Sequence, residues 1–137
     1  MTDSELHTVT VSVGSNVPGA HERVLAALQW LHGVLGHMRT SDVYCTPARR
    51  GSSTYANCVA CGTTPLCPEA LTERFKAYEL GQGRTQAMRA RHLVPIDIDV
   101  VIHDDVVLRP TDYGRPYFSI GWQQLQMKSE HNGPKNQ

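Results

Sequence analysis

The 137-residue chain lacks any apolar run that approaches the ~20 residues of a membrane-spanning helix. Its start, residues 1–5, is polar and acidic and lacks the pattern of a signal peptide. It also lacks a charge excess, because 13 Lys and Arg residues balance 13 Asp and Glu residues. We therefore expect a cytoplasmic protein that needs neither a membrane nor a nucleic acid as partner. A small anionic ligand stays compatible, since its site needs only local positive charge.

The chain has only four cysteines, and one pair, Cys58 and Cys61, has the C-x-x-C spacing. Such a pair can belong to a zinc or redox site, but no second C-x-x-C follows. The pair lies in a segment with the character of a strand, where residues three apart point to opposite faces. We therefore favour reduced cysteines in or near a core over a zinc or redox site.

Hydrophobic periodicity divides the rest of the chain into strands and helices. Apolar and polar residues alternate in residues 6–13, and apolar residues recur at helical spacing in residues 21–35. Similar patterns predict strands at 38–46, 54–63 and 95–103, and a helix that starts at Pro68 and runs to about Leu80. Residues 84–94 are basic without a clear period and predict a loop.

The order of these elements is strand, helix, strand, strand, helix, strand. It predicts an α+β fold, the ferredoxin-like βαββαβ sandwich, with one antiparallel sheet and both helices packed on one face. A short strand at 106–108 and a short helix at 118–127 would follow. We expect a single domain over residues 1–137, with a polar, disordered tail from about residue 128.

The segment Pro95–His103 carries the strongest chemical signal. Strict alternation would turn one face, Ile96, Ile98, Val100 and Ile102, toward the helices. It would turn the other face outward, with Asp97, Asp99, Val101 and His103. The two carboxylates would stand roughly 6–7 Å apart at the backbone and suit Mg²⁺, which takes one or two carboxylates together with substrate phosphates. The D-x-D pattern alone is common, so a solvated strand face is the alternative.

Six short segments, in order and at nearly the same spacings, resemble motifs of the 6-hydroxymethyl-7,8-dihydropterin pyrophosphokinases. The resemblance spans about residues 9–125. The segments are Val13-Gly-Ser-Asn16, Tyr44-Cys-Thr-Pro47, Tyr55-Ala-Asn57, Glu79-Leu-Gly-Gln-Gly-Arg84, Ile96-Asp-Ile-Asp99 and Arg115-Pro-Tyr117. Each motif is weak alone, but the ordered set is specific.

The resemblance implies an enzyme that transfers the terminal pyrophosphoryl unit of ATP to the hydroxymethyl group of the dihydropterin, a step of folate biosynthesis. Its substrates would be two small molecules, the pterin and ATP. Asp97 and Asp99 would hold two Mg²⁺ ions that bridge the triphosphate. We expect a monomer or a weak homo-oligomer.

The resemblance also assigns the binding residues. On the pterin side, Asn57 would read the amide edge of the ring, two aromatic residues would stack on its faces, and two residues would add pocket contacts. The aromatic residues are Tyr55 and Tyr117, and the pocket residues are Thr46 and Pro47. The nucleotide would meet Glu79, Arg84, Arg89, Val100 and Arg115. Arg84 and Arg91 would join the Asp pair in catalysis.

The departures from the family pattern fall in the nucleotide half. The later arginines of the loop are replaced by Gln86, Ala90 and Val94, while Arg89 and Arg91 keep positive charge in a shifted register. A histidine-containing segment before the closing arginine is also missing, and Lys76 replaces the usual glutamine. An active pyrophosphokinase and a non-catalytic pterin-binding relative therefore both stay open. A ligand-free interaction module is a third hypothesis, disfavoured by the aromatic and amide set.

Overall fold

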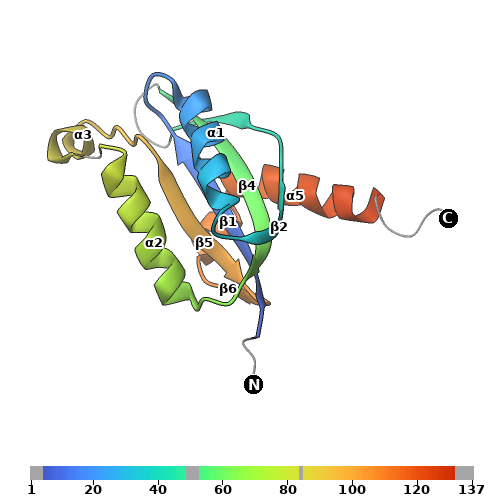
Figure 1. Cartoon of the computed structure of the whole chain (residues 1–137). Helices are drawn as coiled ribbons and strands as arrows, with labels where there is room; N and C mark the ends of the chain where they lie inside the picture. Colours follow the sequence, from blue (N-terminus) through green and yellow to red (C-terminus); the bar gives the residue numbers. More distant parts are fainter. Residues whose placement is uncertain (1–4, 49–52, 84, 132–137) are drawn as a thin grey trace.

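The computed structural model describes residues 5–48, 53–83 and 85–131, without the side chains of residues 129–131. Figure 1 shows how the helices and strands are arranged. In chain order they are β1 (His7–Ser15), α1 (Ala20–Leu31), β2 (Gly36–Thr40), β3 (Tyr44–Pro47), β4 (Thr54–Thr64), α2 (Pro68–Gly81), α3 (Gln86–Ala90), β5 (Asp97–His103), β6 (Val106–Val107), α4 (Pro110–Tyr113) and α5 (Pro116–His131).

The strands form one sheet in the order β2-β4-β1-β5-β6, with β3 also paired to β4. All the pairings are antiparallel. The predicted α+β, ferredoxin-like sheet is therefore confirmed. The strand predicted over residues 38–46 is divided into β2 and β3. At the break, the Ser41 amide still donates to the Val59 carbonyl at 2.8 Å, but the Val59 amide donates to the Ser41 hydroxyl at 3.0 Å, so a side-chain oxygen replaces one backbone acceptor.

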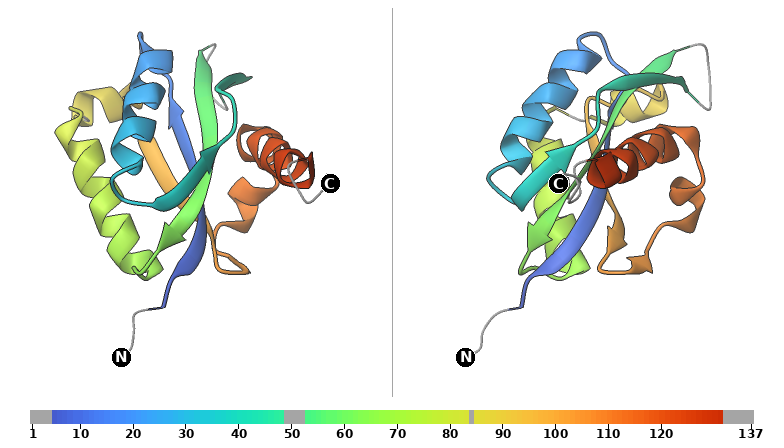
Figure 2. Two further views of the ribbon diagram at one scale, coloured as in Figure 1. Left: turned by 45° about the vertical axis from the view of Figure 1, so that its right-hand side comes forward. Right: turned by 90° about the vertical axis from the view of Figure 1, so that its right-hand side faces the viewer.

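The sheet has a hydrophobic core on each face. On one face, α1 and α2 cover the larger core, which includes Val11, Leu31, Phe75 and Ile98. On the other face, α5 covers a smaller core of Val59, Val101, Ile102, Phe118 and Leu125. Figure 2 shows the two layers on opposite sides of the sheet. Both predicted helices thus share one face, as expected, and α5 adds a third layer.

A β-bulge interrupts the alternation of β5. Thr10 of β1 pairs with Ile102 and Val11 pairs with Val100, so Val101 is an extra residue in β5. Beyond the bulge, Ile102 joins the core under α5. His103 contacts Leu66, which packs against the larger core. The prediction that His103 shares the face of Asp97 and Asp99 is therefore wrong.

Two helical segments differ from the predictions. The predicted loop over residues 84–94 contains α3, because the Thr85 hydroxyl caps the helix by accepting from the Met88 amide at 3.1 Å. The last helix, α5, continues to His131, so the tail predicted from about residue 128 begins as helix. The remainder of that tail, residues 132–137, lies outside the described residues.

The cysteines follow the favoured interpretation. All four are free thiols, with Cys58 buried in the larger core and Cys61 packed against the smaller one. The pair therefore points to opposite faces of β4, as predicted. Within the described residues, the helices are all too short or too polar to cross a bilayer.

Candidate active site

A cleft of about 670 Å³ opens at the end of the sheet where β1 and β3 end and β4 and β5 begin. Antiparallel pairing brings these strand ends together, although they are far apart in sequence. The cleft collects most of the predicted site residues, namely Thr46, Pro47, Tyr55, Asn57, Arg89, Asp97, Asp99 and Tyr117. Arg109 and Asp112 also line it.

Asn57 is fixed by hydrogen bonds between β3 and β4. Its amide nitrogen donates to the Thr46 hydroxyl at 2.9 Å and to the carbonyls of Tyr44 and Tyr55 at 3.2 and 3.3 Å. Carbonyl oxygens only accept, so these partners determine which end of the amide is the nitrogen. Gly14 and Asn57 both line the cleft. Gly14 has no side chain, and a Cβ at this position would lie 3.5 Å from the Asn57 oxygen, so the oxygen borders the space that glycine leaves open. Asn57 therefore offers a ligand an acceptor.

Tyr117 is held from both ends. Its hydroxyl bonds to the Asp112 carboxylate, and its carbonyl accepts from the Tyr44 hydroxyl at 2.6 Å. Burial raises the pKa of Tyr44 to about 12, which keeps this hydroxyl a neutral donor. Tyr117 thus faces the cleft from the start of α5, with Tyr55 on β4 also in the lining.

Asp97 and Asp99 lie at the start of β5 on one side of the strand. Asp99 is the more enclosed, with 14% of its side chain exposed against 37% for Asp97. Burial, together with the neighbouring Asp97 charge, raises the pKa of Asp99 to about 7. A cation bound beside the pair would favour the ionised form of Asp99.

Lys76, one turn before the end of α2, contacts this pair. Its ammonium lies 3.5 Å from an Asp99 oxygen and 3.7 Å from an Asp97 oxygen. It also lies 3.1 Å from the Glu79 carboxylate. Glu79 is 2% exposed and accepts the Ile98 amide of β5 at 2.9 Å. Glu79 thereby satisfies a backbone group between the two aspartates and holds Lys76 beside them.

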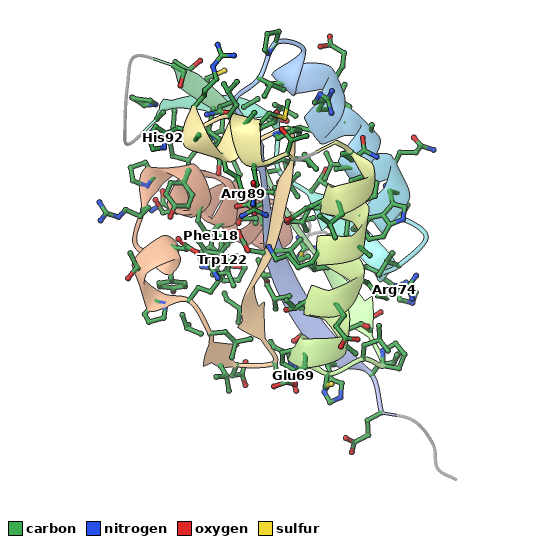
Figure 3. All side chains as sticks on the ribbon, turned by 90° about the vertical axis from the view of Figure 1, so that its left-hand side faces the viewer. Glu69, Arg74, Arg89, His92, Phe118 and Trp122 are labelled. Atoms are coloured by element: carbon green, nitrogen blue, oxygen red, sulfur yellow. The ribbon has the colours of Figure 1, made fainter. Side chains whose placement is uncertain are left out.

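Arginines approach the carboxylates from two other elements. Arg109, just before α4, bonds to Asp112 and places a guanidinium nitrogen 3.9 Å from Asp99. Arg89 lies on α3, and Figure 3 shows it below that helix, toward β5. The carboxylate end of the cleft therefore holds acidic and basic side chains together.

Asn16 joins the segment after α3 to the end of β1 through hydrogen bonds, and we call this contact the Asn16 latch. The side-chain nitrogen of Asn16 donates to the His92 carbonyl at 2.7 Å, and its oxygen accepts the Val94 amide at 2.6 Å. Its backbone amide also donates to the Val94 carbonyl at 3.1 Å. His92 adopts a left-handed conformation with φ 59°, which Asn16 helps to hold.

Residues 10–127 match the family model described as 7,8-dihydro-6-hydroxymethylpterin-pyrophosphokinase (HPPK). The chain belongs to this family. No curated protein sequence matches the chain. Membership confirms the predicted resemblance, and the family is one of pyrophosphokinases of folate biosynthesis.

Four other described residues that were predicted for the nucleotide or for catalysis lie outside the lining of the cleft: Glu79, Arg91, Val100 and Arg115. Arg84 lies outside the described residues. Arg91 is exposed at the C-terminal end of α3, and Arg115 is exposed before α5. Val100 is 5% exposed and belongs to the larger core. Glu79 is buried on α2, where its carboxylate accepts the Ile98 amide of β5. The nucleotide contacts predicted for Glu79, Arg84, Val100 and Arg115, and the catalytic role predicted for Arg91, stay predictions.

The sequence pattern missed three charged residues of the HPPK cleft region: Lys76, Arg109 and Asp112. Two local signals pointed to them. Lys76 precedes Glu79 by three residues on a helix, and Arg109 precedes Asp112 by three, so each pair shares a face. Neither signal indicates that Lys76 and Arg109 both approach Asp99, because that requires the packing of α2 and α4 against β5.

The donors at the carboxylate end fit Mg²⁺, the ion that the HPPK family uses. Asp97 and Asp99 supply the hard oxygen ligands that this ion prefers. Burial and the neighbouring Asp97 keep the pKa of Asp99 raised, although Lys76 and Arg109 lie within 4 Å of the carboxylate. A bound divalent ion would lower that pKa and keep both carboxylates ionised.

Proposed function

We propose that this chain transfers the terminal pyrophosphoryl unit of ATP to the hydroxymethyl group of 6-hydroxymethyl-7,8-dihydropterin, in a reaction that requires Mg²⁺. One observation carries the proposal. A single cleft joins the predicted pterin residues to the Asp97 and Asp99 carboxylates, with Arg89 and Arg109 at the same end. Pterin and triphosphate would therefore meet within one cavity.

In this proposal, the pterin half orients the acceptor. The Asn57 oxygen accepts from the N–H groups on the amide edge of the ring, because its nitrogen is already bonded within the protein. Tyr55 and Tyr117 cover the ring faces, and Thr46 and Pro47 complete the wall. Holding the hydroxymethyl oxygen in one position removes much of the entropic barrier to transfer.

The other half stabilises charge. Asp97 and Asp99 would hold Mg²⁺, which when bound neutralises phosphate charge and aligns the triphosphate. Arg89 and Arg109 would bond phosphate oxygens as charge develops on them. Arg109 is already ordered by Asp112, which reduces the entropy lost when it binds phosphate. The catalytic roles predicted for Arg84 and Arg91 stay predictions, as do two bound Mg²⁺ ions, a cytoplasmic location and the oligomeric state.

A non-catalytic pterin-binding relative is the second candidate, and one observation favours it. The Lys76 ammonium already partly neutralises the carboxylate pair, which reduces the need for a cation there. An exposed lysine on a flexible stem can move aside, however, and its side chain is 46% exposed. The Asp pair otherwise has no use in a protein that binds only the pterin.

Calorimetry with the dihydropterin and a non-hydrolysable ATP analogue, with and without Mg²⁺, tests the proposal alongside a direct transfer assay. We expect the wild type to bind the nucleotide only with Mg²⁺ and to form the pyrophosphorylated pterin. Asp97→Ala and Asp99→Ala should each lower the transfer rate by at least about 10²–10³-fold while pterin binding persists. Pterin binding without any transfer would favour the non-catalytic relative. Wild-type transfer in either variant would refute the metal assignment.

A further inference from the structure

A second cluster of metal-ligating side chains lies at the end of β5 remote from the cleft. His7, His103 and Asp104 each offer one ligand atom, and these atoms lie within 4.8 Å of one another. His7 begins β1, His103 ends β5, and Asp104 starts the turn to β6. Val9 pairs with His103, so the cluster rests on two hydrogen-bonded strands.

His103 is oriented as a metal ligand would be. The bulge at Val101 turns its ring toward Leu66, whose carbonyl lies 3.0 Å from the ring Nε2. A carbonyl can only accept, so Nε2 carries the proton and Nδ1 keeps its lone pair. That Nδ1 lies 3.9 Å from the Asp104 carboxylate. A carbonyl bonded to the second ring nitrogen is the usual outer contact of a ligating histidine.

Asp104 is held with one oxygen toward both histidines. Its Oδ1 accepts the Thr8 amide at 3.1 Å, and its own amide donates to the Thr8 carbonyl at 2.7 Å. Its Oδ2 lies 2.8 Å from His7 Nδ1. The residue adopts φ 53°, a conformation that glycine favours, yet it carries the carboxylate that joins the cluster.

We propose that His7, His103 and Asp104 form a site for a zinc-class divalent transition metal. In a tetrahedral zinc site, ligand atoms stand about 3.3 Å apart, and the 2.8 and 3.9 Å separations from Asp104 bracket that value. The metal would displace the proton that His7 shares with Asp104. The fourth position faces solvent, because the side chains of His7 and Asp104 are 29% and 51% exposed.

The two ends of β5 would then select different ions. Two imidazole nitrogens with one carboxylate suit Zn²⁺, whereas the all-oxygen pair at Asp97 and Asp99 suits Mg²⁺. A metal at the remote end would tie the start of β1 to the β5–β6 turn. It would stabilise the folded chain by mass action without touching the cleft.

Titration of the untagged full-length chain with ZnCl₂, in excess Mg²⁺, tests this site. We expect one zinc equivalent, bound at least about 10-fold more weakly by His7→Ala and by Asp104→Asn. His32→Ala removes an exposed histidine after α1 and should leave the affinity unchanged. Asp97→Asn/Asp99→Asn should also retain zinc, which separates this site from the carboxylate pair.

Cobalt provides a second readout that identifies the ligands. We expect Co²⁺ to give visible absorption of a low-coordinate nitrogen and oxygen site, without a thiolate charge-transfer band. Such a band, lost in Cys45→Ser or Cys67→Ser, would assign the metal to the exposed thiols and overturn the proposal. The proposal would also be overturned if the wild type did not bind zinc, or if His7→Ala and Asp104→Asn bound zinc as tightly as the wild type.

Discussion

The two halves of the cleft are built from different kinds of secondary structure. The pterin half rests on β3 and β4, where Tyr44 pairs with Asn57 and Thr46 pairs with Tyr55 in a regular ladder. The phosphate half is assembled from the start of β5, the end of α2 and the short helices α3 and α4. One half is thus a continuous sheet, and the other is a meeting of separate segments.

The halves also differ in charge. The Asn57 side chain makes neutral hydrogen bonds in the absence of a ligand. Asp99, in contrast, is a half-buried carboxylate, and burial together with the neighbouring Asp97 raises its pKa to about 7. In the proposed function, folding alone therefore fixes the side chain that recognises the pterin. The phosphate half, in contrast, depends on the charges of bound Mg²⁺ and triphosphate.

The largest expected effect within this comparison comes from Asn57→Leu. The substitution removes the acceptor for the pterin edge and leaves ligand donors unmatched, which costs about 2–4 kcal/mol in pterin binding. That cost corresponds to about a 30- to 1000-fold weaker Kd. Calorimetry should show nearly unchanged binding of Mg²⁺ and the ATP analogue. Unchanged pterin affinity, or an equal loss of nucleotide affinity, would contradict the division into halves.

Two arginines, Arg109 and Arg91, test which basic residue of the phosphate half acts in the chemical step. Arg109 lies 3.9 Å from Asp99, whereas Arg91 is exposed outside the cleft lining. We expect Arg109→Ala to slow the chemical step by about 10²-fold and Arg91→Ala to slow it less. Quenched-flow measurement isolates this step from product release. A larger loss in Arg91→Ala would restore the catalytic role that the sequence predicted for it.

Lys76→Gln tests the internal counter-ion. Removing the ammonium from beside Asp97 and Asp99 should strengthen Mg²⁺ binding without nucleotide about three- to tenfold, because a competing positive charge is lost. Arg74→Gln is the control, since it removes a charge of the same sign from the outer side of α2 (Figure 3). Equal effects of the two variants in a Mg²⁺ titration would show that only net charge matters.

Asp99→Asn tests the raised pKa of the phosphate half through stability, without any ligand. Because folding raises the pKa of Asp99 from 3.8 to about 7, the folded state favours the protonated carboxyl, and this stabilisation is lost as pH rises through that interval. In metal-free buffer, the melting temperature of Asp99→Asn should therefore rise relative to that of the wild type by roughly 5 °C for each pKa unit of the shift, as the pH increases through the interval. Asp105→Asn, on an exposed turn, should follow the wild type. If the difference in melting temperature between Asp99→Asn and the wild type did not change with pH, the raised pKa of Asp99 would be excluded as its cause.

The parts of the site that the sequence predicted lie on paired strands. Alternation along residues 95–99 placed Asp97 and Asp99 on one side, and the aromatic-x-Asn segment placed Tyr55 and Asn57 on a strand near Thr46. Period-two patterns survive folding wherever one face is buried, so the D-x-D face could be derived from the residues themselves. The pairing of β3 with β4 then brought the pterin set together.

The unpredicted parts depend on tertiary packing. Residues 100–102 are all branched and apolar, so their pattern fits a regular strand and a bulge equally well. Lys76 and Arg109 reach Asp99 only because α2 and α4 contact β5. The helical spacing of Phe118, Trp122 and Leu125 predicts α5 but contains no information about which face of the sheet it covers.

The Asn16 latch has a consequence for protein engineering. Asn16 fixes the chain at His92 and Val94, and the Thr85 cap fixes the entry into α3, so the backbone between them spans two anchored points. We therefore expect residues 86–91 to accept another segment of the same length, provided that it keeps a basic residue in the place of Arg89, which lines the cleft. With that residue kept, an arginine-rich insert of six residues would need to satisfy only these two anchors, and the sheet below would require no redesign.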